Sequence, residues 1–165
     1  MATPATRYYL EMTSPDDLRP ATMVEAEVEL RQITEPNPEI NLFFYTTVGA
    51  NYHWIDRRIW TKQQWLEYLC QPQIETWVLY VAETQTGYFE LEAQAGNNVK
   101  LAYFGLVPEF IGRKLGSYLL TNATKRAWQK GACRVWTHTS THDHPHALSN
   151  YLARGFHVFK KEPLP

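Results

Sequence analysis

A histidine-rich run near the C-terminus holds the densest group of side chains that could do chemistry. From His138 to His146 the chain reads HTSTHDHPH, which places four of its six histidines and Asp143 in one short stretch. Imidazole and carboxylate groups are common zinc ligands, but zinc ligands must converge on one point. Alternate residues are parallel on a strand and diverge by about 200° in a helix, and Pro145 interrupts either element. The run therefore argues against a metal site, although a small histidine metalloprotein stays open as an alternative.

A glycine-containing turn between a strand and a helix is the second group of interest. From 104 to 120 the chain reads FGLVPEFIGRKLGSYLL, with Arg113 and Lys114 between Gly112 and Gly116. The first N–H groups of a helix lack intrahelical acceptors and lie at the positive end of its dipole, so they bind anions. The spacing matches neither GxxxxGK[ST] nor GxGxxG. The turn predicts a phosphate site, and a plain turn with a solvated basic pair is the alternative.

The composition indicates one folded domain that covers residues 1–165. Hydrophobic residues make up 44% of the 165 residues, and the formal net charge is −1. These values are typical of a globular chain without the basic excess of a nucleic-acid-binding protein. No apolar run approaches the ~18 residues of a membrane helix, and no secretory signal is visible. We therefore expect a cytoplasmic protein with reduced cysteines and with no nucleic-acid or membrane partner.

The order of the predicted elements indicates a mixed α/β fold. Alternating apolar and charged residues over 23–33 are typical of a half-buried strand. Asn37 and Thr61 are suited to cap two helices, and Gly131 is suited to end the longest one. The alternation of strands and helices in the second half predicts crossover helices. We expect strands over 7–12, 23–33, 76–84, 87–94, 99–110, 133–141 and 156–162, a hairpin around TQTG at 84–87, and helices over 35–50, 61–72, 112–131 and 145–155.

Two segments resemble the GNAT superfamily of acetyl-CoA-dependent N-acetyltransferases. FGLVPEFIGRKLGSYLL is similar to the family's strand, pyrophosphate loop and helix, and DHPHALSNYLARGF is similar to its helix that ends in a tyrosine and a Gly-Phe pair. The loop matches the family pattern at Gly116 and departs from it at Ile111 and Lys114. The resemblance implies a central twisted mixed β-sheet flanked by helices, with a splayed strand pair that holds CoA. It also implies acetyl transfer from acetyl-CoA to a primary amine, by direct attack in a ternary complex and without a metal.

The resemblance also assigns residues to the cofactor. The strand 103–107 would separate from the strand 134–139, and the pantetheine arm would pair with the backbone of Leu106 and Val107. His144 would contact the cofactor arm. The pyrophosphate would rest on the backbone amides of Gly112, Arg113, Lys114, Leu115, Gly116 and Ser117.

Two residues are candidates for proton transfer. By resemblance, Tyr151 lies near the thioester sulfur, where a phenol can protonate the departing thiolate; the alternative is a core aromatic packed against Phe156. An alkyl ammonium titrates near ~10.4, so a base must accept a proton before attack. Glu90, in mid-strand between aromatic residues, is the candidate base, and a solvated strand glutamate is the alternative. Some family members carry the base on the next strand, where Lys100 cannot serve.

The loop NYHWIDRR between two predicted helices is the candidate acceptor site. His53, Trp54, Asp56 and Arg57 offer an aromatic wall, a titratable ring, an anion and a cation. Loops concentrate such functional groups. The alternative is a packed loop with Trp54 in the core and Asp56 paired with a neighbouring arginine.

Several alternatives stay open at this point. The acceptor is a small molecule or a protein, the acyl group is acetyl or longer, and a homodimer is one option. The rival function is a non-catalytic module of the same fold that binds CoA or another ligand.

Overall fold

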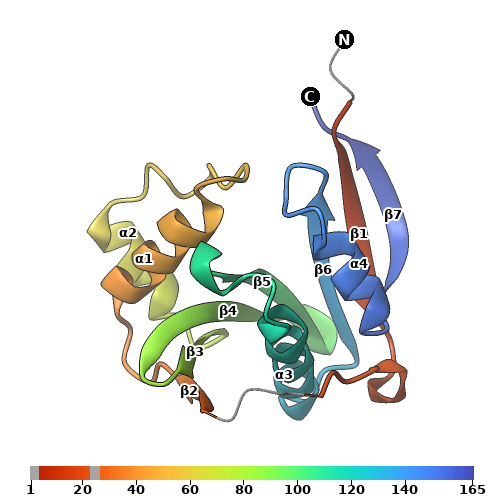
Figure 1. Cartoon of the computed structure of the whole chain (residues 1–165), viewed down its shortest axis with the longest axis horizontal. Coiled ribbons are helices and arrows are strands. Elements are labelled where there is room, and N and C mark those ends of the chain that lie inside the picture. The colour runs from red at the N-terminus through yellow and green to blue at the C-terminus, as the bar shows by residue number, and fades with distance from the viewer. Residues whose placement is uncertain (1–3, 23–26) are drawn as a thin grey trace.

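The computed structural model describes residues 4–22 and 27–165, and these form one seven-stranded sheet (Figure 1). The strands are β1 (Thr6–Met12), β2 (Val28–Gln32), β3 (Ile74–Val81), β4 (Thr84–Gln94), β5 (Asn98–Leu106), β6 (Arg134–Ser140) and β7 (His157–Pro163). Their order across the sheet is β2-β3-β4-β5-β6-β1-β7. β5 and β6 are parallel, and the other neighbours are antiparallel. The mixed sheet confirms the predicted fold class.

Four α-helices in the described residues connect the strands: α1 (Pro38–Gly49), α2 (Lys62–Leu69), α3 (Leu115–Gln129) and α4 (Ala147–Ala153). The Asn37 side chain accepts a hydrogen bond from the Glu39 N–H (3.1 Å), and Thr61 forms a capping box with Gln64. Both caps confirm the sequence-based prediction. Gly131 follows α3 with φ of 87°, the left-handed conformation in which glycine ends a helix. None of the described helices is long and apolar enough to cross a membrane.

Side chains alternate along the central strands, so each face of the sheet builds its own core. Phe89 of β4 packs in the larger core with Leu119 of α3 and Tyr151 of α4. Tyr88, the preceding residue, stacks on Phe44 of α1 with ring centroids 4.8 Å apart. The alternation therefore places α1, with α2 packed beside it, on one face and α3 and α4 on the other (Figure 1).

The β3–β4 hairpin turns at Ala82 and Glu83, before the predicted turn at 84–87. Ala82 and Glu83 have φ of 46° and 68°, and the segment 84–87 is part of β4. Two left-handed residues form the tight turn whose twist matches antiparallel strands. Gly87 is needed for another reason, because a Cβ there would lie 2.7 Å from the Leu106 side chain. The sequence prediction was wrong because this glycine serves the close approach of β5.

The strand predicted over 23–33 is only partly described. The structure has Val28–Gln32 as β2, and residues 23–26 lie outside the described residues.

Strands β5 and β6 begin side by side and then separate. Their parallel pairing joins residues 98–100 to residues 134–136 and ends there. On its other edge β5 stays paired with β4 as far as Leu106, with a register shift after Glu90. Such a bulge bends the paired strands. The Leu101 carbonyl still accepts a hydrogen bond from the Thr137 hydroxyl of β6 (2.9 Å), and residues 102–106 have a backbone edge open toward β6, which confirms the predicted splay.

Candidate active site

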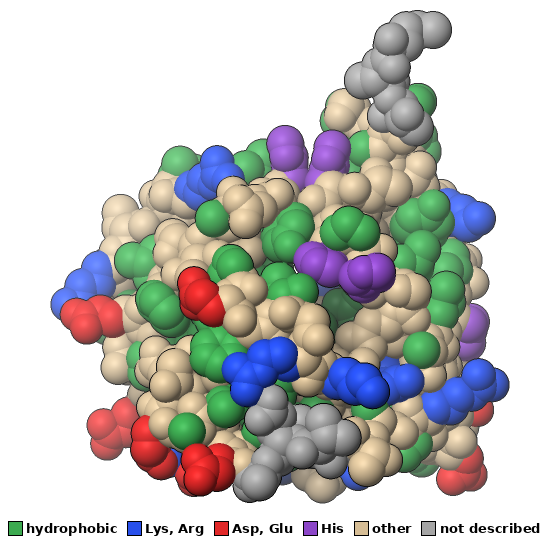
Figure 2. All heavy atoms as spheres, viewed as in Figure 1, with side chains coloured by type: hydrophobic (Ala, Val, Ile, Leu, Met, Phe, Trp, Pro, Cys, Tyr) green, Lys and Arg blue, Asp and Glu red, His purple; other side chains and the backbone are tan. Residues whose placement is uncertain are grey.

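A cleft of about 900 Å³ lies where β5 and β6 separate. Its walls come from these two strands, the loop between α1 and α2, the turn before α3, and α4 with the loop before it. Figure 1 shows these segments meeting between the α1–α2 side and the β6–β1 side of the molecule. Figure 2 shows histidine side chains gathered on the upper part of the same face. The histidine-rich run therefore belongs to the rim of a cleft.

The turn before α3 forms one end of the cleft. Gly112 and Lys114 have φ of 92° and 63°, and no atom lies within 4 Å of the place where a Cβ of Gly112 would be. The Tyr118 N–H donates to the Lys114 carbonyl (3.4 Å), so the preceding N–H groups of the first turn can reach an anion. The Ser117 hydroxyl donates to Asn150 Oδ1 (3.1 Å) and ties α3 to α4. This end of the cleft can hold an anionic group on backbone N–H donors.

Lys114 reaches its left-handed conformation at a cost. A Cβ makes this region unfavourable by about 1 kcal/mol, so glycine is the usual residue there. Lys114 nevertheless lines the cleft, and its ammonium adds positive charge to the anion-binding end.

Tyr151 of α4 lies on the wall of the cleft and in the larger core at once. It is 7% exposed, and its ring centroid lies 5.8 Å from that of Phe156 and 6.2 Å from that of Phe104. Burial, and to a smaller extent the Asp143 carboxylate, raise the pKa of the Tyr151 phenol above its ordinary value. The phenol therefore keeps its proton at neutral pH and can donate it to a developing anion.

The loop between α1 and α2 forms the opposite wall. The Trp54 ring packs against Tyr45 and Tyr103, with centroid distances of 5.6 and 5.0 Å. His53 stacks on His142 of the β6–α4 loop, with centroids 4.5 Å apart and planes 22° apart. The two loops therefore touch across the rim of the cleft.

Arg57 and Glu90 form a buried ion pair at the base of this loop. Arg57 Nη1 donates to the two Glu90 carboxylate oxygens (2.9 and 3.1 Å), and the side chains are 7% and 0% exposed. The Tyr68 hydroxyl and the Asn41 amide donate to the same carboxylate at 2.9 and 3.0 Å. The guanidinium carbon lies 4.2 Å from the centroid of the Tyr103 ring. These contacts compensate the burial of two charges and hold the loop against β4.

The family model for the acetyltransferase (GNAT) family matches this sequence over residues 30–156. The chain belongs to the GNAT family. The match begins within β2 and covers every later element up to α4, so it includes the splayed strands, the turn before α3 and Tyr151. Family membership supports an acyltransferase.

Solved structures with low sequence identity share the fold. A GCN5-related N-acetyltransferase from Sphaerobacter thermophilus gives a TM-score of 0.73 at 15% identity, over 97% of this chain and 50% of that chain. Another from Kribbella flavida gives 0.69 at 14% identity, over 97% and 58%. The PaiA N-acetyltransferase from Thermoplasma acidophilum, in complex with coenzyme A, gives 0.51 at 23% identity, over 64% and 75%. This chain thus spans 50–58% of the length of the first two structures. No curated protein sequence matches the chain.

Most residues assigned to the cofactor by family resemblance line the cleft; they are Leu106, Gly112, Lys114, Gly116, Ser117 and His144. Val107 and Leu115 are 2% and 0% exposed. The Val107 N–H donates to the Thr86 carbonyl (2.8 Å), so only the Val107 carbonyl is left for a pantetheine arm, and the assignment of Val107 stays a prediction. Arg113 lies outside the lining, with its guanidinium 5.2 Å from the Phe110 ring.

The four residues predicted for the acceptor also line the cleft, and the predicted base does not. His53, Trp54, Asp56 and Arg57 lie on its wall. Asp56 is exposed and has no ion-pair partner in the described residues, because Arg57 pairs with Glu90 of β4. Glu90 is fully buried beneath the wall.

The sequence analysis missed the basic groups on the sheet side of the cleft. Arg7, Lys100 and His138 line it from β1, β5 and β6. Burial, followed by the charges of Lys100 and Arg7, lowers the pKa of His138 to about 4. Strand alternation could have indicated that Lys100 faces the acceptor side, but only the position of β1 next to β6 brings Arg7 there.

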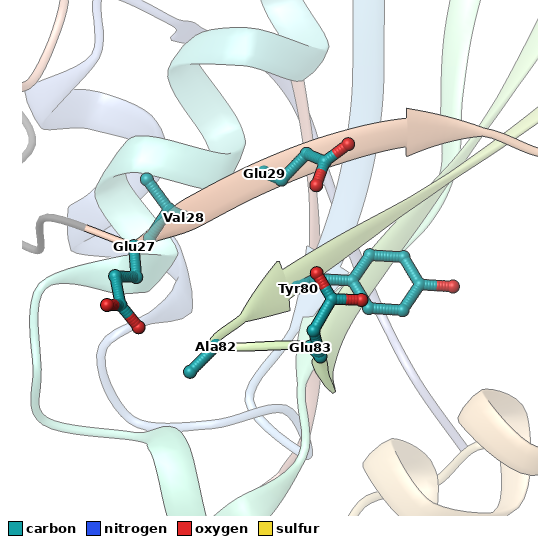
Figure 3. Close-up of a pocket in the computed structure, with 6 residues that line it drawn as sticks. All are labelled: Glu27, Val28, Glu29, Tyr80, Ala82 and Glu83. Carbon is teal, nitrogen blue, oxygen red and sulfur yellow. The ribbon is translucent and has the colours of Figure 1, made fainter.

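No group of three or more histidine, cysteine, aspartate or glutamate side chains among the described residues could hold a metal ion. A second hollow, of about 390 Å³, lies at the β2 edge of the sheet beside the β3–β4 turn (Figure 3). Glu29 and Glu83 line it, and both carboxylates pair with Arg31 (2.7 and 3.1 Å). These side chains are 37–78% exposed, so this hollow offers no group shielded from water.

Proposed function

We propose that this protein transfers the acetyl group of acetyl-CoA to a primary amine. The observation that carries the proposal is the splay of β5 from β6, with the first turn of α3 at one end and Tyr151 on the wall. Acetyl-CoA would supply the thioester. The amine and the thioester would react directly within a ternary complex.

The residues of the cleft fit CoA in two respects. The N–H groups at the start of α3 can bind the pyrophosphate, with the Lys114 ammonium adding charge. The open edge of β5 can pair with the amides of the pantetheine arm, and Leu106 lines this part of the cleft. The basic turn and the open edge compensate for the left-handed lysine in the loop.

Tyr151 is the proposed general acid. As the amine nitrogen bonds to the carbonyl carbon and the C–S bond breaks, the phenol would donate its proton to the leaving sulfur. The nitrogen would lose one proton to the base, from which the phenolate would then be reprotonated. Because burial raises the pKa of Tyr151, the phenol is protonated at neutral pH and has a proton to donate when the C–S bond breaks.

Glu90 remains the predicted base, and its surroundings define how to test it. Four hydrogen bonds already reach its carboxylate, and a proton from the amine would have to travel through the wall. Asp56 and Glu92 are carboxylates on the lining of the cleft. Glu90→Gln, Asp56→Asn and Glu92→Gln variants should be compared by the pH dependence of kcat/KM. The base is the carboxylate whose loss removes the acidic limb of the profile.

A calorimetric titration with acetyl-CoA, followed by an amine screen that measures CoA release, tests the proposal. One site per chain and turnover of an amine are expected. Binding without turnover of any amine would favour a non-catalytic CoA-binding module. Absence of binding at millimolar acetyl-CoA would overturn both functions.

A further inference from the structure

Lys100 places an ammonium group without an ion-pair partner on the wall of the cleft. The residue is half-buried, and its Nζ lies 5.0 Å from the centroid of the Trp136 ring. Burial lowers the pKa of Lys100, against the attraction of Glu92. None of the carboxylates in the described part of the chain forms a salt bridge with it. A partly desolvated ammonium in this state is stabilised by an anionic ligand.

Arg7 brings a second cation to the same wall. The antiparallel pairing of β1 and β6 places Arg7 opposite Ser140, two residues beyond His138. The positive charge of Arg7 disfavours the charged form of Lys100 and contributes to the lowered pKa of Lys100. The carboxylate nearest to Arg7 is Glu162 at 3.6 Å, and both side chains are about one-third exposed (36% and 35%). A loose and solvated pair of this kind can yield to a ligand.

One carboxylate of the cleft, Glu92, lies opposite Lys100 in the β4–β5 pairing, and the other two, Asp56 and Asp143, lie on loops. Asp143 accepts a hydrogen bond from the Ser140 N–H (3.0 Å), and Glu92 accepts one from the Gln94 amide (2.6 Å). Asp56 comes from the loop between α1 and α2, on the other side of the cleft. The sheet side of the cleft therefore has two cations, Lys100 and Arg7, and one carboxylate, Glu92, whereas the loop side has Asp56. This layout complements a molecule with one anionic and one cationic end.

We propose that the acceptor is an amine that also carries a carboxylate, as a free amino acid does, and that Lys100 and Arg7 bind this carboxylate. The inference rests on the proposed acetyl transfer and names its substrate class. The carboxylate binds as an ion on the sheet side, while the amine lies toward Asp56 and Tyr151. Trp54 and Tyr103 line the space between the two sides and can contact an apolar side chain.

Matched pairs of amines test the substrate class. L-phenylalanine with phenethylamine, and L-leucine with isoamylamine, differ only in the carboxylate. CoA release and mass spectrometry of the product should give a kcat/KM at least ~10-fold higher for the amino acid of a pair, the effect of one charge-assisted hydrogen bond. Equal or slower turnover of both amino acids would overturn the proposal.

Lys100→Met removes the charge and keeps a similar length, so it should lower this amino acid to amine ratio by at least ~10-fold. Lys161→Met on β7 is the matched control, because Lys161 lies outside the cleft lining. Lys100→Arg keeps the charge. Both of these variants should retain the ratio within about threefold. An unchanged ratio in a Lys100→Met protein with a native circular dichroism spectrum would refute the role of Lys100.

A binding measurement separates failure of the subsite from failure of the transfer reaction. N-acetyl-L-phenylalanine is titrated calorimetrically into the protein saturated with CoA, and the Kd should be at least ~10-fold weaker in Lys100→Met. If the Kd weakens in Lys100→Met and no amine is acetylated, the carboxylate subsite is supported and the proposed acetyl transfer is refuted. If amines are acetylated and binding is insensitive to Lys100, the transfer reaction stands and the subsite falls.

Discussion

The two ends of the cleft are built in different ways. The end at α3 comes from one continuous segment, residues 106–117, whose main contribution is backbone N–H groups and an open strand edge. The end at the α1–α2 loop is assembled from β1, β5, β6 and that loop, and its contribution is side chains. The first end depends on local conformation, and the second depends on how distant strands are ordered.

The two ends therefore differ in how much they depend on side-chain identity. A turn that contributes backbone N–H groups depends little on its side chains, and here it has a lysine in the left-handed conformation. A side-chain-built wall changes character with each residue. Lys100 and Arg7 contribute two cationic side chains to this wall.

Substitution of Tyr151, on the wall of the cleft, should give the largest effect, because Tyr151 is the proposed general acid. Tyr151→Phe removes only the phenol hydroxyl, and we expect kcat to fall by about 10²–10⁴-fold because the leaving sulfur loses its acid. Steady-state CoA release measures this loss, and calorimetry should find the Kd for CoA changed by less than about threefold. Tyr80→Phe, near the C-terminal end of β3 and outside the cleft lining, is the control and should leave kcat unchanged. A Tyr151→Phe enzyme of full activity would contradict the assignment.

The acceptor end should be the more fragile one, because a buried ion pair anchors its loop. Arg57→Met leaves the Glu90 carboxylate buried without its cation, so we expect a loss of about 3–5 kcal/mol in the free energy of unfolding. Urea denaturation measures the loss. Arg58→Met, on the same loop but exposed, should cost less than ~0.5 kcal/mol. The Arg57→Met/Glu90→Gln double variant should recover part of the loss, and strict additivity of the two changes would contradict the coupling.

Gly131 and Gly155 both have positive φ, but only Gly155 would bring a Cβ into a clash, so substituting each one separates backbone strain from steric conflict. Gly155 has φ of 106°, and a Cβ there would collide with the Asp17 carbonyl oxygen. Gly131 has φ of 87° with no atom within 4 Å of a Cβ. We expect Gly131→Ala to cost about 1 kcal/mol and Gly155→Ala about 3 kcal/mol by thermal or urea unfolding. Equal costs would show that the Asp17 segment can move away.

A pH dependence of stability is expected from His138 on the cleft wall. His138 has a pKa of about 4 in the fold against about 6.5 in the unfolded chain, chiefly because it is buried. Its contribution to stability is therefore complete above pH ~6.5 and is lost as the pH falls toward 4, because the unfolded state binds the proton first. Urea denaturation at steps from pH 7 to pH 4.5 should show a loss of roughly 2 kcal/mol that His138→Asn reduces. The exposed His157→Asn is the control, and an equal slope in all three proteins would contradict this source.

Much of the second half was predictable from the sequence because its signals are local. The turn at Gly112–Gly116, the helix after it and the cap at Gly131 follow from short-range rules of chain geometry. The same rules predicted the helix caps at Asn37 and Thr61. They failed at the β3–β4 hairpin, because Gly87 is required by the close approach of the neighbouring strand β5 and not by the turn.

Contacts between distant segments were out of reach of those rules. The Arg57–Glu90 pair joins residues from a loop and from β4, and the His53–His142 stack joins two loops. In each case the partners were visible as candidates, but their pairing depends on the strand order and the register of the sheet.

The sequence by itself determined the family, the element order and the glycine-containing turn before α3, because each depends on residues that follow one another along the chain. The tertiary structure alone decided which side chains line the acceptor side of the cleft. Insertion of β1 between β6 and β7 places Arg7 on the cleft lining with Lys100, and the packing of the α1–α2 loop on β4 pairs Arg57 with Glu90. Neither event has a local signature, because both are set by packing across a sheet whose neighbouring strands are far apart in sequence.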